Sequence, residues 1–116
     1  MTKLISFCLC SAVFVTGLVT QWAWAVSGDP QKGRTIYERS CITCHGAKGK
    51  GDGPASQMLT PPPADLTSPK TQAKSENDLL KTIQNGRPPS SMPAFSAQLT
   101  EQEIYDVYSY IRTIGR

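Results

Sequence analysis

Two cysteines and the chain's one histidine stand together in the order Cys41-Ile42-Thr43-Cys44-His45. Two thiols separated by two residues can add to the two vinyl groups of one haem, and each addition forms a thioether bond. The imidazole of the next residue can offer a neutral nitrogen to the haem iron. This spacing predicts covalent haem attachment through Cys41 and Cys44, with His45 as an iron ligand.

Three other kinds of site use the same residue types. A thioredoxin-like redox pair belongs with a βαβ pattern, and the sequence shows no alternating strand pattern. A structural zinc site takes about four ligands, and only Cys41, Cys44 and His45 are of the Cys/His kind after residue 25. A disulfide can form in an oxidising compartment, but it gives no role to His45. The haem interpretation uses all three side chains.

The second iron ligand cannot be another histidine, since the chain has one, which leaves Met, Lys, water or an open position. Met92 precedes Pro93, and a proline stiffens a loop that could hold a thioether toward iron. Met58 precedes the run 61–63 of prolines, and we expect it to pack near the haem as the alternative ligand. Filling an apolar gap is the other role open to either methionine.

The first element that must position these residues is a helix ending where the motif begins. Asp29 followed by Pro30 is typical of an N-cap and a first-turn proline, and the pattern predicts a helix over residues 30–40. Residues 46–69 are rich in glycine and proline, so they cannot continue as a helix or a central strand. We expect a long loop that packing over a haem would hold in place.

Two further helices are predicted by their capping residues. Ser75 begins one helix, and Asn85-Gly86 supplies its left-handed end. Thr100 and Glu103 form a capping box for the last helix, and its apolar residues recur at the spacing of one helical face: Ile104, Val107, Tyr108 and Ile111. With no strand pattern and no internal repeat, the sequence predicts an all-α fold with extended loops.

Length and charge limit the classes of function. The chain has 116 residues, which indicates one domain, and a domain this small gains from an added core element such as a haem. The formal charge is +3, and the basic residues are spread without a dense run. This distribution gives no reason to expect nucleic acid as a partner.

Residues 1–25 have the pattern of a signal peptide. Lys3 precedes the apolar stretch 4–19, and Ala23-Trp24-Ala25 matches the small-x-small rule of a cleavage site. We expect an exported, periplasmic protein whose domain comprises residues 26–116 and has no membrane contact after cleavage. The alternative is an uncleaved segment that anchors the protein in the membrane.

Several short stretches complete a pattern around the attachment motif: Gly33 and Tyr37, Gly46 after the motif, Gly51-Asp52-Gly53-Pro54, Pro63-Ala64-Asp65-Leu66-Thr67, Met92-Pro93-Ala94-Phe95 and Tyr108-Ser109-Tyr110-Ile111. Over nearly all of residues 28–116 the sequence resembles the class I c-type cytochromes. The resemblance implies a cytochrome c fold, with three to five short helices and long loops around one covalently bound haem c. It also implies that the first and last helices cross at Gly33.

The same resemblance suggests roles for further residues. The Met92-Pro93 pair is similar to the family's distal-ligand segment, which implies His45 and Met92 as the two iron ligands. Pro63 and Leu66, together with Pro62, are expected to line the haem pocket, and Tyr108 and Ile111 are expected to close its opposite side. Arg87 is a candidate partner for a haem propionate, although most loop arginines are simply solvated.

A haem iron with two protein ligands has no open position, so it gains and loses one electron rather than binding a substrate. The sequence therefore predicts an electron-transfer protein without catalytic residues, carrying electrons between redox proteins outside the cytoplasm. We expect a monomer that docks transiently with a donor and an acceptor. Two alternatives are a haem c subunit of a larger dehydrogenase or oxidase, and a haem-based gas or redox sensor.

Overall fold

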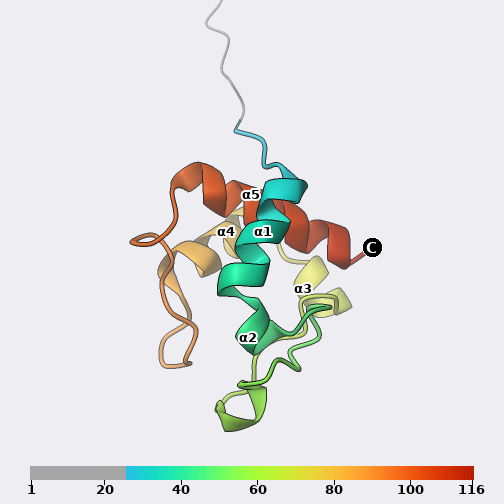
Figure 1. Ribbon diagram of the computed structural model, residues 1–116, viewed down its shortest axis with the longest axis vertical. Helices are drawn as coiled ribbons and strands as arrows, with labels where there is room; N and C mark the ends of the chain where they lie inside the picture. Colours follow the sequence, from blue (N-terminus) through green and yellow to red (C-terminus); the bar gives the residue numbers. More distant parts are fainter. Residues whose placement is uncertain (1–25) are drawn as a thin grey trace, which may run out of the picture.

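The computed structural model describes residues 26–116, and this part of the chain consists of helices and loops without a strand (Figure 1). The elements are α1 Pro30–Ser40, α2 Ile42–His45, the 3-10 helix η1 Ser56–Met58, α3 Pro69–Gln72, α4 Glu76–Asn85 and α5 Glu101–Ile114. The all-α prediction is confirmed. The predicted signal peptide, residues 1–25, lies outside the described residues. Within residues 26–116, no helix is long and apolar enough to cross a membrane.

The three longer helices begin and end through local hydrogen bonds that the sequence indicated. The carboxylate of Asp29 accepts the first amides of α1, and the Ser75 hydroxyl accepts an amide in the first turn of α4. Thr100 and Glu103 form the predicted reciprocal capping box at the start of α5. After α4 the backbone turns at Gly86, which has a φ of +70°. The amide of Gly86 donates to the carbonyl of Thr82 at 3.0 Å and so closes the last turn of the helix.

The centre of the fold is the contact between α1 and α5, which lie across each other (Figure 1). A Cβ atom added at Gly33 would collide with the backbone carbonyl of Asp106 on α5. Asp106 is buried, and its carboxylate accepts the amide of Asp29 at 2.8 Å and the side-chain amide of Gln102 at 2.9 Å. The two helices are therefore joined both by backbone contact and by a buried, hydrogen-bonded carboxylate.

One cluster of buried apolar side chains continues from this crossing. The tightest members are Tyr37, Ile104 and Val107, each at most 2% exposed. The rest of the cluster comes from all the longer helices and from the loops: Ile36, Leu66, Leu80, Ile83, Phe95, Leu99 and Ile111. The predicted apolar face of α5 is thus confirmed as buried, apart from Tyr108, which is only half-buried.

The segment predicted as one long loop contains more local structure than expected. The segment includes the turn η1, and α3 begins at its end. There the Ser68 hydroxyl accepts the amide of Thr71, and Pro69 occupies the first turn. Gln72 at the end of α3 donates to the carbonyl of Leu66 at 2.7 Å, and Arg112 of α5 donates to the carbonyl of Gln72 at 2.7 Å. These bonds attach the loop to the last helix.

We predict that Gly33→Ala destabilises the protein by about 1–3 kcal/mol, because the added methyl must separate two packed helix backbones. In an open helix the same change would stabilise by roughly 0.5–1 kcal/mol, so the sign of the effect is informative. The measurement is the free energy of unfolding in denaturant. Thr35→Ala, at an exposed position of the same helix, is the control and should stay close to wild type. Equal or greater stability of Gly33→Ala would contradict the close contact.

Candidate functional site

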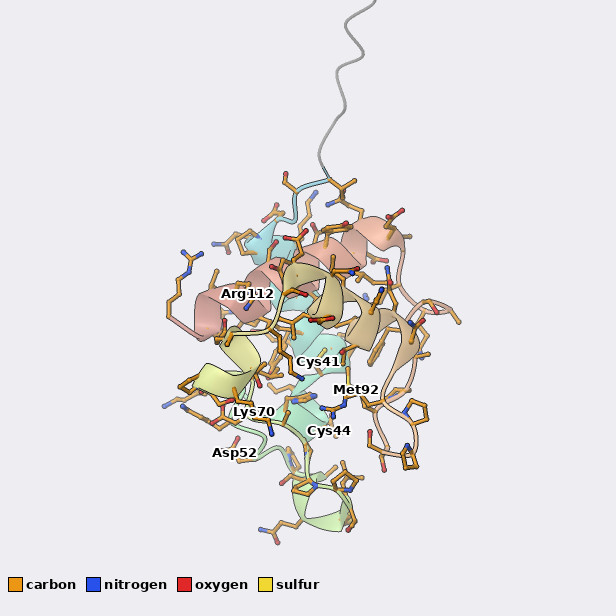
Figure 2. All side chains as sticks on the ribbon, turned by 180° about the vertical axis from the view of Figure 1, so that it is seen from behind. Cys41, Cys44, Asp52, Lys70, Met92 and Arg112 are labelled. Atoms are coloured by element: carbon orange, nitrogen blue, oxygen red, sulfur yellow. The ribbon has the colours of Figure 1, made fainter. Side chains whose placement is uncertain are left out.

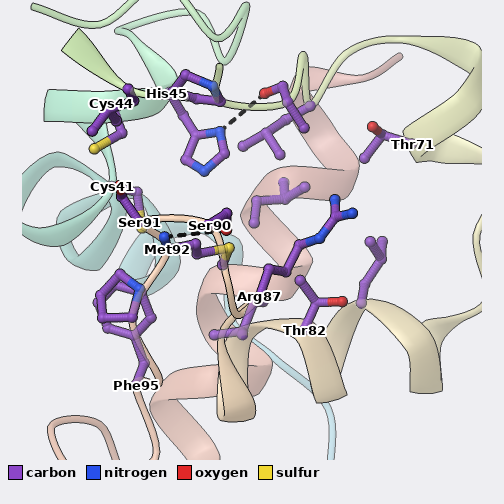
Figure 3. Close-up of a pocket in the computed structure, with 18 of the residues that line it drawn as sticks. Cys41, Cys44, His45, Thr71, Thr82, Arg87, Ser90, Ser91, Met92 and Phe95 are labelled. Carbon is purple, nitrogen blue, oxygen red and sulfur yellow. Dashed lines mark hydrogen bonds between the residues drawn. The ribbon is translucent and has the colours of Figure 1, made fainter. Parts of the chain in front are cut away.

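The predicted site residues meet around one cavity of about 510 Å³ (Figure 3). The cavity is bordered by α2, by the segment 59–66, by α4 and α5, and by the loop 87–95. Eight lining residues are those expected from the sequence: Cys41, Cys44, His45, Pro62, Pro63, Leu66, Met92 and Ile111. Arg87, the candidate partner of a haem propionate, lines the cavity as well. Cys41, Cys44 and Met92 lie close together in the view of all side chains (Figure 2). Segments 51 positions apart in sequence thereby contribute to a single site.

The attachment segment is held by the loop that follows it. The amide of Gly51 donates to the carbonyl of His45 at 2.8 Å, and the amide of Gly53 donates to the carbonyl of Cys44 at 3.1 Å. Gly46 and Gly51 have φ values of +80° and +76°, which side chains other than glycine rarely adopt. The glycine-rich sequence thus lets the chain turn back, so that its amides satisfy the carbonyls at the end of α2.

The ring of His45 is oriented by a backbone acceptor. Its Nδ1 lies 3.0 Å from the carbonyl oxygen of Ala64, so a proton on Nδ1 is donated to that oxygen and Nε2 keeps its lone pair. Burial lowers the pKa of His45, although the bond to Ala64 opposes this shift. A neutral imidazole with a free Nε2 and a bonded Nδ1 is the usual form of a histidine metal ligand.

The Cys41 thiol lacks the lowered pKa of a reactive redox thiol. Cys41 and Cys44 are both free and half-buried. Burial, with a smaller contribution from Cys44, raises the pKa of Cys41 to about 11, whereas a reactive redox thiol needs a lowered pKa. In residues 26–116 no three or more His, Cys, Asp or Glu side chains gather as a metal site of that kind. The thioredoxin-like and zinc alternatives therefore find no support in the geometry.

Met92 enters the cavity from the loop 87–95, and His45 enters it from α2, so both side chains face the same space (Figure 3). The loop is fastened to α4 because the amide of Phe95 donates to the carbonyl of Ile83 at 3.1 Å. Its start is closed by a bond of 3.2 Å from the amide of Arg87 to the carbonyl of Met92. The loop thus presents the thioether from a constrained backbone.

Two sequence-based expectations about neighbouring residues are wrong. Met58 does not pack toward the cavity: it is 79% exposed on η1, beside but not among the lining residues. Tyr108 does not close the far side either, because the Arg112 guanidinium covers its ring at 5.2 Å from the centroid. Ile111 and Val107 of α5 line the cavity there. Val107, one residue before Tyr108 on α5, thus takes the place that was expected for Tyr108.

Sequence reasoning also missed lining residues that carry no chemical signal of their own. The apolar floor includes Leu79, Ile83 and Phe95, which the periodicity of α4 and the neighbourhood of Met92 indicate only as general core. Lys74 lines the cavity as well as Arg87, and these are its only two charged side chains apart from the titratable groups of the motif. No carboxylate is present among the lining residues.

These residues fit a covalently attached haem. A volume of about 510 Å³ lies within the range of roughly 300–1,000 Å³ that cofactor sites occupy. Two thiols, an imidazole and a thioether are donors suited to vinyl addition and to iron. Lys74 and Arg87 can face the two carboxylates of such a group, and the remaining walls are mostly apolar.

Comparison with known proteins agrees with this chemistry. The family model described as Cytochrome c matches residues 30–115, which is most of the chain. The protein therefore belongs to the cytochrome c family. Members of this family bind covalently attached haem c with its iron and transfer electrons without catalysing a reaction of their own, and haem c is the cofactor of this protein.

Individual relatives are similar over different shares of their length. Cytochrome c-554(547) of Halothiobacillus neapolitanus is 32% identical over 95 residues, covering 76% of this chain and 99% of that protein. The cbb3-type cytochrome c oxidase subunit CcoP of Azospirillum brasilense is 31% identical over 85 residues, covering 73% of this chain but 28% of the subunit. A chain of the Kuenenia stuttgartiensis reducing HAO-like protein complex has a similar structure, with a TM-score of 0.63 and 26% identity over 74% of this chain and 42% of that one.

We predict that Cys41→Ser and Cys44→Ser each leave a single thioether, and that the double variant retains no covalently bound haem, because these thiols are the two that line the cavity. Denaturing electrophoresis with haem staining, together with the mass of the intact chain, measures attachment. Ser91→Ala, at another lining position without a thiol, is the control and should keep full attachment. Covalent haem in the double variant would refute the assignment.

Proposed function

We propose that this protein is an exported carrier of single electrons, in which Cys41 and Cys44 attach the haem and His45 and Met92 ligate its iron. The observation that carries the proposal is that the imidazole and the thioether face one cavity that the two thiols also line. Both ligand positions are then taken by side chains from segments that the fold holds in place. The bound haem supplies the one-electron redox couple.

The protein's own residues make this role efficient in three ways. The Ala64 carbonyl fixes the ring of His45, and the bonds of the loop 87–95 fix Met92, so neither ligand must reorganise when an electron arrives. The apolar walls exclude water, and a thioether favours the reduced state of the iron compared with harder ligands. A comparatively high reduction potential is the expected consequence.

Docking of redox partners is proposed to occur at the mouth of the cavity. The rims 59–64 and 88–95 contain no charged side chain, and they include the exposed residues Pro61, Pro88 and Pro89. Lys74 and Arg87 are proposed to face the haem propionates, so that the mouth is close to neutral. Brief contacts through a small, nearly uncharged surface suit a carrier that must release each partner quickly.

Export is proposed from residues 1–25, whose basic start, apolar stretch and small-x-small end match a cleavable signal. The periplasm is the proposed destination of the processed protein, which we expect to be monomeric. Attachment of the cofactor by covalent bonds is useful to a carrier outside the cytoplasm, because dilution cannot then remove it.

A second candidate function is that of a haem c subunit or domain in a larger redox complex. It is favoured by the similarity to the CcoP subunit, of which this chain spans 28%. In that arrangement the same cavity and ligands would pass electrons within a stable assembly. Purification under gentle conditions separates the two functions, since a carrier elutes alone and a subunit elutes with larger proteins.

We predict that Met92→Ala opens one iron position. The ferrous variant should bind carbon monoxide, which the wild type ignores, and its reduction potential should fall by on the order of 100 mV, within the roughly 0.8 V range that axial ligands control. Visible spectra and a redox titration measure both effects. Met58→Ala is the matched control, because Met58 is the other methionine of the described chain and is exposed outside the cavity.

Two results would contradict the ligand assignment. If the wild type binds carbon monoxide readily, an iron position is already open, and a sensing role takes precedence over electron transfer. If Met58→Ala rather than Met92→Ala admits carbon monoxide, the ligand is Met58 and the geometry of the loop 87–95 has another purpose.

We predict that Arg87→Gln lowers the reduction potential by tens of millivolts, because a cation near the haem disfavours its more positive oxidised state. A redox titration at fixed pH and ionic strength measures the shift. Lys81→Gln removes a cation from an exposed position of α4 that does not line the cavity, so its effect should be smaller. Equal shifts in the two variants would show that Arg87 acts only through the overall charge.

A further inference from the structure

The hydroxyl group of Tyr37 lies in the core but is not needed to fill space there. Tyr37 is 0% exposed, and its ring lies against the ring of Tyr110 with centroids 5.2 Å apart. A phenylalanine would fill nearly the same space without bringing a polar group into the core. Burying a hydroxyl is costly unless it finds a partner. The presence of tyrosine at this position therefore directs attention to the bond that the hydroxyl makes.

That bond reaches the attachment segment. The Tyr37 hydroxyl donates to the carbonyl oxygen of Gly46 at 2.7 Å, and the bond is buried. Gly46 directly follows His45 and has a φ of +80°, so it is the point where the chain leaves α2 and turns back. The amide of Gly49 also donates to this carbonyl, at 3.1 Å. Burial raises the pKa of Tyr37, and the phenol therefore keeps the proton that it donates.

Besides the bond from its own amide to the Cys41 carbonyl, three hydrogen bonds restrain the backbone and ring of His45. Gly51 holds its carbonyl, Ala64 holds its Nδ1, and Tyr37 holds the next carbonyl along the chain. Two of the three have backbone atoms on the partner side. The Tyr37 bond alone among them comes from a side chain of another element, α1, which is itself fixed against α5 at Gly33.

We propose that Tyr37 is a positioning residue for His45. Its hydroxyl bond to the Gly46 carbonyl ties the backbone next to His45 to the fixed α1–α5 pair, and this restraint helps to set the orientation of the iron-bound imidazole ring. The inference rests on the proposed function, since it assumes that His45 ligates the iron. Without the hydroxyl, the Gly46 carbonyl keeps only the bond from the Gly49 amide, and the backbone that carries the ring loses one of its restraints. Tyr37 is not among the residues that line the cavity, so its effect is indirect.

The test compares Tyr37→Phe with Tyr110→Phe in the haem-loaded protein. The two variants each lose one hydroxyl from the same aromatic pair, but no hydrogen bond of the Tyr110 hydroxyl reaches the attachment segment. In Tyr37→Phe we expect the iron-shifted NMR resonances of the His45 ring to move, the reduction potential to change, and the Gly49 amide to exchange about tenfold faster, as for the loss of about 1.4 kcal/mol. Tyr110→Phe should leave all three near wild type.

Unchanged His45 resonances and an unchanged potential in a destabilised Tyr37→Phe protein would overturn the proposal, because the hydroxyl would then serve only stability. If Tyr37→Phe does not accumulate with haem, 3-fluorotyrosine placed at residue 37 keeps the hydroxyl and makes it a stronger donor. The His45 resonances should then shift, and their constancy would overturn the proposal equally. A wild type whose His45 resonances show no effect of the iron would instead refute the ligation, and the inference with it.

Discussion

The structure depends first on the contact between α1 and α5. Because Gly33 has no side chain, the two helix backbones meet directly, and the buried Asp106 carboxylate joins them by accepting hydrogen bonds from both. Every other element is placed relative to this pair. α2 follows α1 after a single residue, so fixing α1 also fixes the direction in which the attachment motif leaves it. This close helix contact thereby determines where the chemistry occurs.

The loops take their shape from hydrogen bonds rather than from apolar packing alone. Amides of the glycine-rich turn satisfy the carbonyls of the attachment segment, Ala64 orients the ring of His45, and Arg112 fastens the end of α3. In a protein this small, such bonds substitute for a larger core. They leave a cavity whose walls are mostly apolar and into which a few polar groups, among them the His45 ring, point. That combination suits a cofactor that must change its charge by one electron with little rearrangement.

The sequence was most informative where the information is local. Capping residues predicted the starts of α1, α4 and α5, since a capping hydrogen bond involves neighbours only three residues apart. The attachment motif predicted the donors of the site for the same reason. Met58 was misplaced because its expected position rested on the proline run beside it, and Tyr108 because its expected position rested on helical spacing. The orientation of both side chains depends on segments far away in sequence. Periodicity defines the buried face of a helix but not which neighbour covers each residue.

By itself, the sequence determined that the protein is helical, that it carries a covalently bound haem, and which thiols and imidazole are available to hold it, because these follow from residue types and short spacings. Tertiary structure alone decided that Met92 faces the same cavity as His45 while Met58 faces solvent, that Lys74 joins Arg87 at the wall, and that the Tyr37 hydroxyl reaches Gly46. Each of these depends on contacts between segments that are distant in sequence. Such contacts depend on how the close α1–α5 contact orients the loops, and no local pattern encodes that orientation.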